Sequence, residues 1–245
     1  MPRFFIDRSQ IEDSSLFILG DDARHIARSL RMAVGDEITV SDGEGTEYAS
    51  RLTRIRDDRC DADIIEKKAS ASEPKSRITL FMAYPKSDKL ETVIQKAVEL
   101  GATEIVPFES SRCIKKPKAD KVAERTARLS RIAEEAAKQC GRATLPTVAL
   151  PISFGEMIKN ANEKELALFC YEGEGTVSLK TILDGLSEAP KSIAVIVGCE
   201  GGFSPDEAKA AEEAGFKMAN LGPRILRCET APDYCLSAIS YRFEL

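Results

Sequence analysis

The sequence contains very little histidine and no closely spaced cysteine pairs. Its 245 residues include one histidine, His25, and seven cysteines, none of which are spaced as CxxC. A structural zinc site and a disulfide framework are therefore not expected, and the cysteines are interpreted as reduced, mostly buried thiols. A single histidine also disfavours Ser–His–Asp and Cys–His catalysis. We expect no metal site.

Long hydrophobic runs are lacking as well. No apolar stretch approaches the ~18 residues of a membrane span. The first ten residues, MPRFFIDRSQ, do not contain the apolar core of a signal peptide. These features predict a cytoplasmic protein without a membrane partner.

Phosphate-binding signatures are the third absence, since neither GxGxxG nor GxxxxGK[ST] occurs. A different glycine-rich stretch is present, in which IAVIV is followed by GCEGGFSPDE. Residues 193–197 form an unbroken apolar run, which predicts a buried central strand. After the glycines, Ser204, Pro205 and Glu207 have the spacing of a helix start. The sequence therefore predicts a strand, a glycine loop and a helix N-terminus in succession.

This succession places backbone N–H groups around a ligand. Glu200 lies inside the loop, and a carboxylate close to a phosphate is repulsive. The loop therefore suits a ligand with cationic groups better than a phosphate, and S-adenosylmethionine is one such ligand. An ordinary tight turn with a solvated glutamate is an equally open interpretation.

Charge is distributed unevenly along the chain. The net charge is −5, but residues 77–150 hold 14 basic against 9 acidic side chains. Most of this excess lies between Arg112 and Arg142, where 10 basic side chains face 4 acidic ones. A local basic face indicates a phosphate-bearing partner better than the overall charge does. The alternative is a solvated helix face.

The first part of the chain has the pattern of a small β-barrel. Short strands are predicted at 3–6, 16–19, 36–41, 47–55 and 60–65, with one helix at 21–32. His25 stands beside Arg28 and Arg31 in that helix, which suggests either RNA contact or a structural histidine on a surface helix. The small, polar stretch 69–76 is the predicted linker, so the predicted domains are 1–70 and 77–245.

After the linker, strands alternate with helices. Strands are predicted at 78–83, 104–108, 165–171, 193–197 and 218–221, and helices at 88–100, 119–140, 178–186, 205–214 and from Thr230 onward. Glu229 and Thr230 are expected to cap the last of these helices. This alternation predicts an α/β domain with a mostly parallel sheet covered on both faces. Ligands of such sheets bind beyond the carboxyl ends of the strands, where the glycine loops 198–202 and 220–224 lie.

These blocks resemble a known family. VGCEGGFSPDE followed by LGPRILRCETA is similar to the signature of the bacterial 16S ribosomal RNA uracil N3-methyltransferases of the SPOUT superfamily. RFFI, HIARSLRMAVGDEITVSDGEG, KSDKLETVIQKAVELGATEIVPFESSR and AAKQCGR fit the same family, so the resemblance spans the whole chain. Two positions depart from it. Cys199 replaces a usual proline, and Cys228 replaces a small hydroxyl or β-branched residue; we interpret Cys228 as a packing residue.

The resemblance implies a PUA-like RNA-binding barrel, a C-terminal domain with a trefoil knot, and a homodimer with the methyl-donor sites near the interface. It implies that S-adenosylmethionine is the cofactor and that 16S ribosomal RNA of the small ribosomal subunit is the substrate. The residues expected to hold the donor are Gly198, Glu200, Gly201, Gly202, Leu221, Gly222, Ile225, Leu226 and Arg227.

Methylation at uracil N3 requires loss of a proton, and a nearby cation stabilises the resulting anion. Arg227 is the first catalytic candidate, unless it forms a structural pair with Glu200 or Glu229. Glu200 is the second candidate, although holding the donor is its favoured role. Basic positions expected to contact RNA are Arg3, His25, Arg28, Arg31, Lys86, Lys89, Arg112, Lys115, Lys116 and Arg142.

Three other functions stay open at this point. The nearest is a SPOUT enzyme that acts on tRNA or on a ribose 2′-hydroxyl, and the resemblance in the first domain disfavours it. A non-catalytic RNA-binding factor of ribosome assembly belongs to a different class. A nucleotide-binding α/β protein is the weakest alternative, because no phosphate signature is present.

Overall fold

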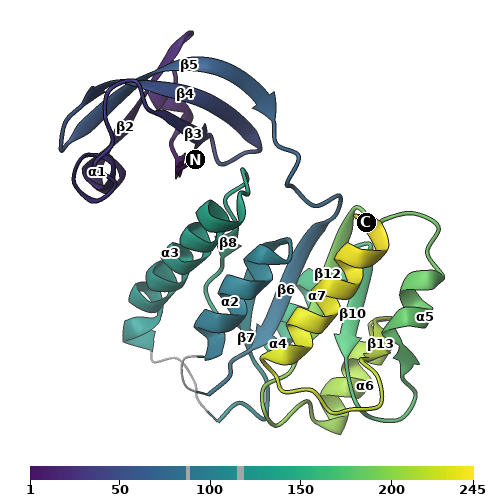
Figure 1. Cartoon of the computed structure of the whole chain (residues 1–245). Coiled ribbons are helices and arrows are strands. Elements are labelled where there is room, and N and C mark those ends of the chain that lie inside the picture. The colour runs from purple at the N-terminus through teal and green to yellow at the C-terminus, as the bar shows by residue number, and fades with distance from the viewer. Residues whose placement is uncertain (87–88, 115–118) are drawn as a thin grey trace. The chain divides into compact units, whose positions relative to one another are not determined.

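The structure, a computed structural model, describes residues 1–86, 89–114 and 119–245 (Figure 1). It divides into two compact units. Unit 1 comprises residues 1–73 and 137–145, and unit 2 comprises residues 74–136 and 146–245. The predicted domains, 1–70 and 77–245, differ from these units because residues 137–145 belong with the N-terminal part.

Unit 1 is built on a curled five-stranded sheet (Figure 1). Its strand order is β1 (Arg3–Phe5), β3 (Glu37–Ser41), β4 (Thr46–Ile55), β5 (Arg59–Ala69) and β2 (Ser15–Leu19). β1 pairs with β3 in parallel, and the other pairs are antiparallel. The prediction of a small β domain is confirmed. Its sheet is curled, and the recorded pairings of the described residues do not join the two edge strands β1 and β2.

Alternating apolar residues fill the inside of this sheet. Leu16, Ile38 and Leu52 are buried there, and Ala23 and Ile26 cover them from the short helical segment. That segment is shorter than the predicted helix 21–32. It consists of α1 (Gly20–Arg24) and a π-helical turn, η2 (His25–Ser29), and Arg31 follows with φ of 51°. A non-glycine residue at positive φ ends the helix because L-residues rarely continue from that conformation. A 3₁₀ turn, η1 (Arg8–Gln10), follows β1.

Unit 2 contains an eight-stranded sheet in which every recorded pair is parallel. The order is β11 (Val177–Ser178), β13 (Lys217–Asn220), β10 (Leu166–Cys170), β12 (Ser192–Val197), β6 (Arg77–Ala83), β7 (Ala102–Glu109) and β8 (Thr147–Val148), with β9 (Ile152–Ser153) also paired to β7. Residues 193–197 are buried between β10 and β6. The predictions of a parallel sheet and a central apolar strand are confirmed.

Helices pack against this sheet. They are α2 (Lys89–Glu99), α3 (Val122–Cys140) after the turn η3 (Ala119–Lys121), α4 (Phe154–Asn162), α5 (Leu179–Asp184), α6 (Pro205–Glu213) and α7 (Thr230–Phe243). α7 contacts β12 as well as α2 and α5, whereas α4 contacts β7 and α6 contacts β13. No helix within the described residues is long and apolar enough to cross a membrane. The knot stays a prediction.

The N-termini of α6 and α7 differ in how they are capped. Ser204 caps α6 by accepting the N–H of Glu207, and Pro205 is the first helical residue, as predicted. The predicted cap of α7 is wrong. Thr230 is the first residue of that helix, and Glu229, at the cap position, has helical dihedral angles and no capping side-chain hydrogen bond.

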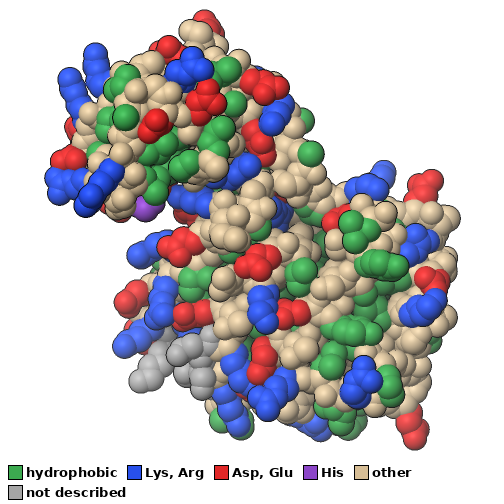
Figure 2. Space-filling model, in the orientation of Figure 1, with side chains coloured by type: hydrophobic (Ala, Val, Ile, Leu, Met, Phe, Trp, Pro, Cys, Tyr) green, Lys and Arg blue, Asp and Glu red, His purple; other side chains and the backbone are tan. Residues whose placement is uncertain are grey.

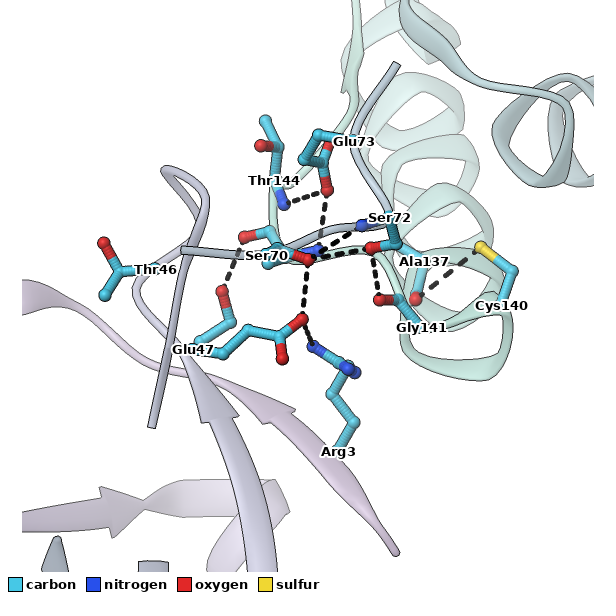
Figure 3. A network of polar contacts seen from close by, with 12 residues as sticks. Arg3, Thr46, Glu47, Ser70, Ser72, Glu73, Ala137, Cys140, Gly141 and Thr144 are labelled. Atoms are coloured by element: carbon cyan, nitrogen blue, oxygen red, sulfur yellow. Dashed lines mark hydrogen bonds and ion pairs between the residues drawn. The ribbon is translucent and has the colours of Figure 1, made fainter. Parts of the chain in front are cut away.

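A polar network inside unit 1 attaches residues 137–145 to the N-terminal segment (Figure 3). The Glu73 carboxylate accepts the N–H groups of Ala143 and Thr144 at 2.8 and 2.9 Å and pairs with Arg142 at 3.0 Å. Ser72 Oγ donates to the carbonyl oxygen of Gly141 at 2.7 Å. Partial burial raises the pKa of Glu73, but these hydrogen bonds and the Arg142 charge outweigh it, so the pKa lies below its usual value.

This network corrects two predicted RNA contacts. The Arg142 side chain is only 3% exposed and faces Glu73, so it is a structural cation. Arg3 is largely covered too, because it donates to Glu47 Oε1 at 3.0 Å. Both arginines were assigned to RNA from the sequence, in which their carboxylate partners lie 69 and 44 residues away.

We expect Arg142→Met to destabilise the protein by about 3 kcal/mol, because it leaves the Glu73 carboxylate without its cation in a partly buried place. Since the pKa of Glu73 is lowered in the folded state, the pair stabilises above the ordinary carboxyl pKa and this contribution is lost as the pH falls through the lowered value. Urea unfolding at neutral and acid pH measures both effects. Arg51→Met, which breaks an exposed pair with Glu37, is the control and should cost under about 1 kcal/mol. Equal losses in the two variants would contradict the assignment.

Candidate functional site

A cavity of about 840 Å³ lies in unit 2, where the strands β10, β12 and β13 end. Its size is within the range of small-molecule sites. Loops that follow these three strands form most of its wall. All the residues predicted to hold the donor line it, namely Gly198, Glu200, Gly201, Gly202, Leu221, Gly222, Ile225, Leu226 and Arg227.

The loop after β12 is closed on itself. The N–H of Gly202 donates to the carbonyl oxygen of Cys199 at 2.9 Å, and Gly202 has φ of 62°. A Cβ atom on Gly198 would lie 3.1 Å from the Cα of Gly202 and 3.2 Å from the Phe203 ring. The Phe203 ring packs against Phe169 in the core, with the ring centroids 4.2 Å apart and the ring planes tilted by 34°, so this neighbour cannot withdraw easily. The loop therefore requires glycine at 198.

Cys199 stands where the resembling family usually has proline, and it is buried. A hydrogen bond with the Cys113 thiol lowers the pKa of Cys199 to about 6, even though burial acts in the opposite direction. The same contact and burial raise the pKa of Cys113. Burial and a hydrogen bond to Glu229 raise the pKa of Cys228 to about 12. A buried, protonated thiol agrees with the packing role expected for Cys228.

Two carboxylates in the cavity wall share one ammonium group. Lys89 Nζ lies 3.2 Å from Glu200 Oε1 and 3.1 Å from Glu229 Oε2. The backbone N–H of Lys86 also donates to both oxygens of Glu200, at 3.1 and 3.2 Å. Partial burial raises the pKa of each carboxyl, but these hydrogen bonds and their own backbone N–H groups outweigh it, so both pKa values are lowered. Both groups are therefore anionic at neutral pH.

Arg227 is exposed on the cavity wall. The alternative in which it forms a structural pair with Glu200 or Glu229 is wrong, because within the described residues both of those carboxylates pair with Lys89. The carbonyl oxygen of Arg227 accepts the N–H groups of Thr230 and Ala231 at 2.8 and 2.9 Å. The backbone of Arg227 is thus fixed at the start of α7, in the wall of the cavity.

The predicted RNA contacts separate into several groups. Arg112 lines the cavity, and its Nη1 donates to the carbonyl oxygen of Gly201 at 2.8 Å. The side chain of Lys86 is exposed, and in unit 1 His25, Arg28 and Arg31 are exposed. Arg28 pairs with Asp57. Lys115 and Lys116 lie outside the described residues. Over the parts of the chain that the structure describes, no cluster of side chains could hold a metal ion.

Basic side chains do not gather into a single patch on the face shown in Figure 2. Lys and Arg are interspersed with Asp and Glu over each unit. The excess counted between Arg112 and Arg142 is partly neutralised within the fold. Arg128 pairs with Glu91 at 2.9 Å, and Lys138 pairs with Asp22 at 3.0 Å.

Sequence reasoning missed one wall of the cavity. Tyr171, Glu172 and Gly173 follow β10 and line the cavity, together with Asn220 and Arg224 from the predicted loop 220–224. The signal that could have found the first three is the end of the predicted strand 165–171. Strand order decides whether that end lies at the cavity, and the sequence does not show that β10 lies between β12 and β13.

Comparison with known proteins gives concordant matches. A family model described as an RNA methyltransferase domain matches residues 72–240, and one described as an RNA methyltransferase PUA domain matches residues 18–65. Ribosomal RNA small subunit methyltransferase E of Bacillus subtilis is 35% identical, with 100% of this chain and 98% of the relative covered. The protein of the same name from Synechocystis is 32% identical over 99% of this chain and 78% of the relative.

Solved structures agree with these matches. The crystal structure of ribosomal RNA small subunit methyltransferase E from Neisseria gonorrhoeae, bound to S-adenosyl methionine, is similar with a TM-score of 0.86 and 31% identity. That match covers 99% of this chain and 98% of the other.

We expect Gly198→Ala to weaken the binding of S-adenosylmethionine by about tenfold or more, because the new Cβ atom would lie 3.1 Å from the Cα of Gly202 and force the cavity loop to shift. Isothermal titration calorimetry measures the dissociation constant. Gly155→Ala in α4 is the matched control, because a Cβ atom there meets nothing within 4 Å. It should leave binding unchanged and stabilise the helix slightly. Unaltered affinity in Gly198→Ala would remove the loop from the binding site.

Proposed function

This chain belongs to the family of RNA methyltransferases that includes ribosomal RNA small subunit methyltransferase E, and from this premise we propose that it methylates N3 of a uracil in 16S ribosomal RNA. The chain is an enzyme with S-adenosylmethionine as its methyl donor. The observation that carries the proposal is the cavity at the ends of β12 and β13, whose wall contains every residue expected to hold the donor and also presents Arg227.

The cavity fits the donor on chemical grounds. Gly198, Gly201 and Gly202 have no side chains, so a ligand can approach their backbone closely. Gly222 also lines the cavity, and its φ of 106° is a conformation that favours glycine. Glu200 supplies negative charge to a ligand that carries a sulfonium and an ammonium group. When bound, S-adenosylmethionine supplies the methyl group as an electrophile.

The chain must stabilise the uracil after N3 has lost its proton. Each pKa unit between N3 and the ambient pH costs about 1.36 kcal/mol. The Arg227 guanidinium is exposed at the cavity and carries donors that match a carbonyl oxygen beside N3, in the manner of an oxyanion site. Glu200 is a poor proton acceptor, because its carboxylate is occupied by Lys89 and by the Lys86 N–H. We therefore assign Glu200 to holding the donor.

Residues 1–70 are assigned to RNA binding and residues 77–245 to methyl transfer. N3 lies on the Watson–Crick edge, so the target base must be unpaired or turned out of its helix. His25 and Arg31 are exposed in unit 1, beside the ion-paired Arg28, and suit contacts with phosphate or with an unstacked base. The assembled small subunit, in the cytoplasm, is the proposed substrate.

We expect Arg227→Ala to lower kcat for methyl transfer by about 10²-fold or more, because the deprotonated base loses its stabilising cation. Small subunits from cells that lack this protein are incubated with labelled donor, and the digested ribosomal RNA is examined by mass spectrometry for N3-methyluridine. Arg227→Lys keeps the charge but not the planar fork and should be intermediate. Lys209→Ala, on the exposed side of α6, is the control.

The outcomes separate the alternatives. Label at N3 that persists in Arg227→Ala would keep the enzyme and reject Arg227. Label in another RNA, or on a ribose, would favour the related SPOUT enzymes. Normal donor binding without any transfer would favour a non-catalytic assembly factor.

A homodimer is the second part of the proposal. The outer face of α7 exposes Tyr234 by 47% and Tyr241 by 76%, seven residues apart and therefore on one side of the helix. Ile225 lines the cavity and is 81% exposed. Aromatic residues are enriched at protein interfaces. A second copy of the chain would cover apolar surface that the single chain leaves in water.

We expect Tyr241→Glu to convert the dimer to a monomer, because it places a charge in the core of the proposed interface. Size-exclusion chromatography with light scattering measures the mass. Lys180→Glu is the control, since Lys180 is an exposed residue of α5 that pairs with Asp184. A monomeric wild-type protein, or a variant that stays dimeric, would reject this surface.

A further inference from the structure

Lys89 was assigned to RNA from the sequence, but its side chain has a different environment. We infer that Lys89 is a positioning residue of the donor site, which holds the loops 198–202 and 221–229 together by pairing with Glu200 and Glu229 at once. The inference rests on the proposed function, because it concerns the same cavity. It assigns Lys89 no contact with the reacting atoms.

The first argument is geometric. Lys89 opens α2, Glu200 follows β12, and Glu229 stands at the cap position of α7. The ammonium group is the only recorded cation that pairs with either carboxylate among the described residues, and it pairs with both, at 3.2 and 3.1 Å. Glu200 and Glu229 lie 111 and 140 residues after Lys89 in the sequence. Three distant segments are thus joined at one nitrogen atom.

The second argument is electrostatic. Since both carboxylate oxygens contact the same Nζ atom, they lie within about 6 Å of each other, where two like charges repel. Hydrogen bonds to Glu229 and Glu200 raise the pKa of Lys89, so the ammonium stays charged. The Cys228 thiol donates to Glu229 at 3.2 Å but carries no charge to offset the repulsion. Removing Lys89 therefore leaves two anions facing each other across the cavity wall.

The third argument concerns RNA. A phosphate that used Lys89 would have to displace two carboxylates already within ion-pair distance. Lys96, one heptad along the same helix, has the more exposed side chain, at 51% against 32%, and pairs only with Asp233 of α7 among the recorded ion pairs. Lys89 is therefore placed to organise the cavity, whereas Lys96 lies outside the cavity wall.

The experiment compares donor binding in the full-length protein. Isothermal titration of S-adenosylmethionine into Lys89→Met should show a dissociation constant raised about tenfold, because the two carboxylates of the cavity wall lose their shared cation. Lys89→Arg should bind within about threefold of the wild type, because the charge is kept. Lys96→Met removes an ion pair between α2 and α7 and should bind like the wild type. Circular dichroism checks that each variant is folded, and Lys89→Gln replaces Lys89→Met if it is not.

The double variant Lys89→Met with Glu229→Gln gives the sharpest test. If Lys89 acts by offsetting the two carboxylates, neutralising one of them in its absence should recover most of the lost affinity. A double variant no better than Lys89→Met would overturn the inference in favour of a direct contact with the donor.

Other outcomes are equally decisive. Normal donor binding in Lys89→Met, with a raised KM for small subunits, would overturn the inference and restore the RNA assignment. Equal losses in Lys89→Met and Lys96→Met would overturn it in favour of a general structural role. A wild-type protein that does not bind the donor would instead reject the proposed function, and the inference with it.

Discussion

Parallel pairing of β12 with β10 on one side and β6 on the other is the constraint on which the rest of unit 2 depends. Parallel strands deliver all their carboxyl ends to one edge, so the loops after β10, β12 and β13 must meet there. Because residues 193–197 are buried on both faces, the register of β12 cannot slip without exposing apolar side chains. The cavity is therefore a consequence of the sheet, and the loops contribute its chemistry.

Charge in that cavity has to satisfy two opposing requirements. A cationic donor favours carboxylates in the wall, whereas the deprotonated base and the RNA phosphates favour cations. The chain resolves this by placing Glu200 and Glu229 around one lysine and leaving Arg227 without a recorded carboxylate partner among the described residues. One cation thus offsets the two carboxylates, while Arg227 has no such pairing among the recorded contacts of the described residues.

Local signals were readable from the sequence, and distant pairings were not. Neighbouring residues are enough to predict the central strand, the glycine loop and the Ser204 cap of α6. The structure has all three as predicted. Arg142 and Lys89 pair with carboxylates 69 and 140 residues away, and the sequence does not reveal such pairings. The wall after β10 was missed for the same reason, since strand order decides which loops are neighbours. An N-cap rule also failed at Thr230, where the backbone is already helical at Glu229.

The misassigned arginines bear on how RNA is recognised. Counting basic residues between Arg112 and Arg142 suggests a strong electrostatic footprint, yet Arg128, Lys138 and Arg142 have carboxylate partners in the fold. Fewer cations are then available for phosphates, and affinity that depends on neutralising phosphates falls with each one removed. The chain as a whole is also negatively charged. Discrimination must therefore come mainly from the shape of the RNA and from a base presented out of its helix, which is how sequence-specific RNA recognition usually works.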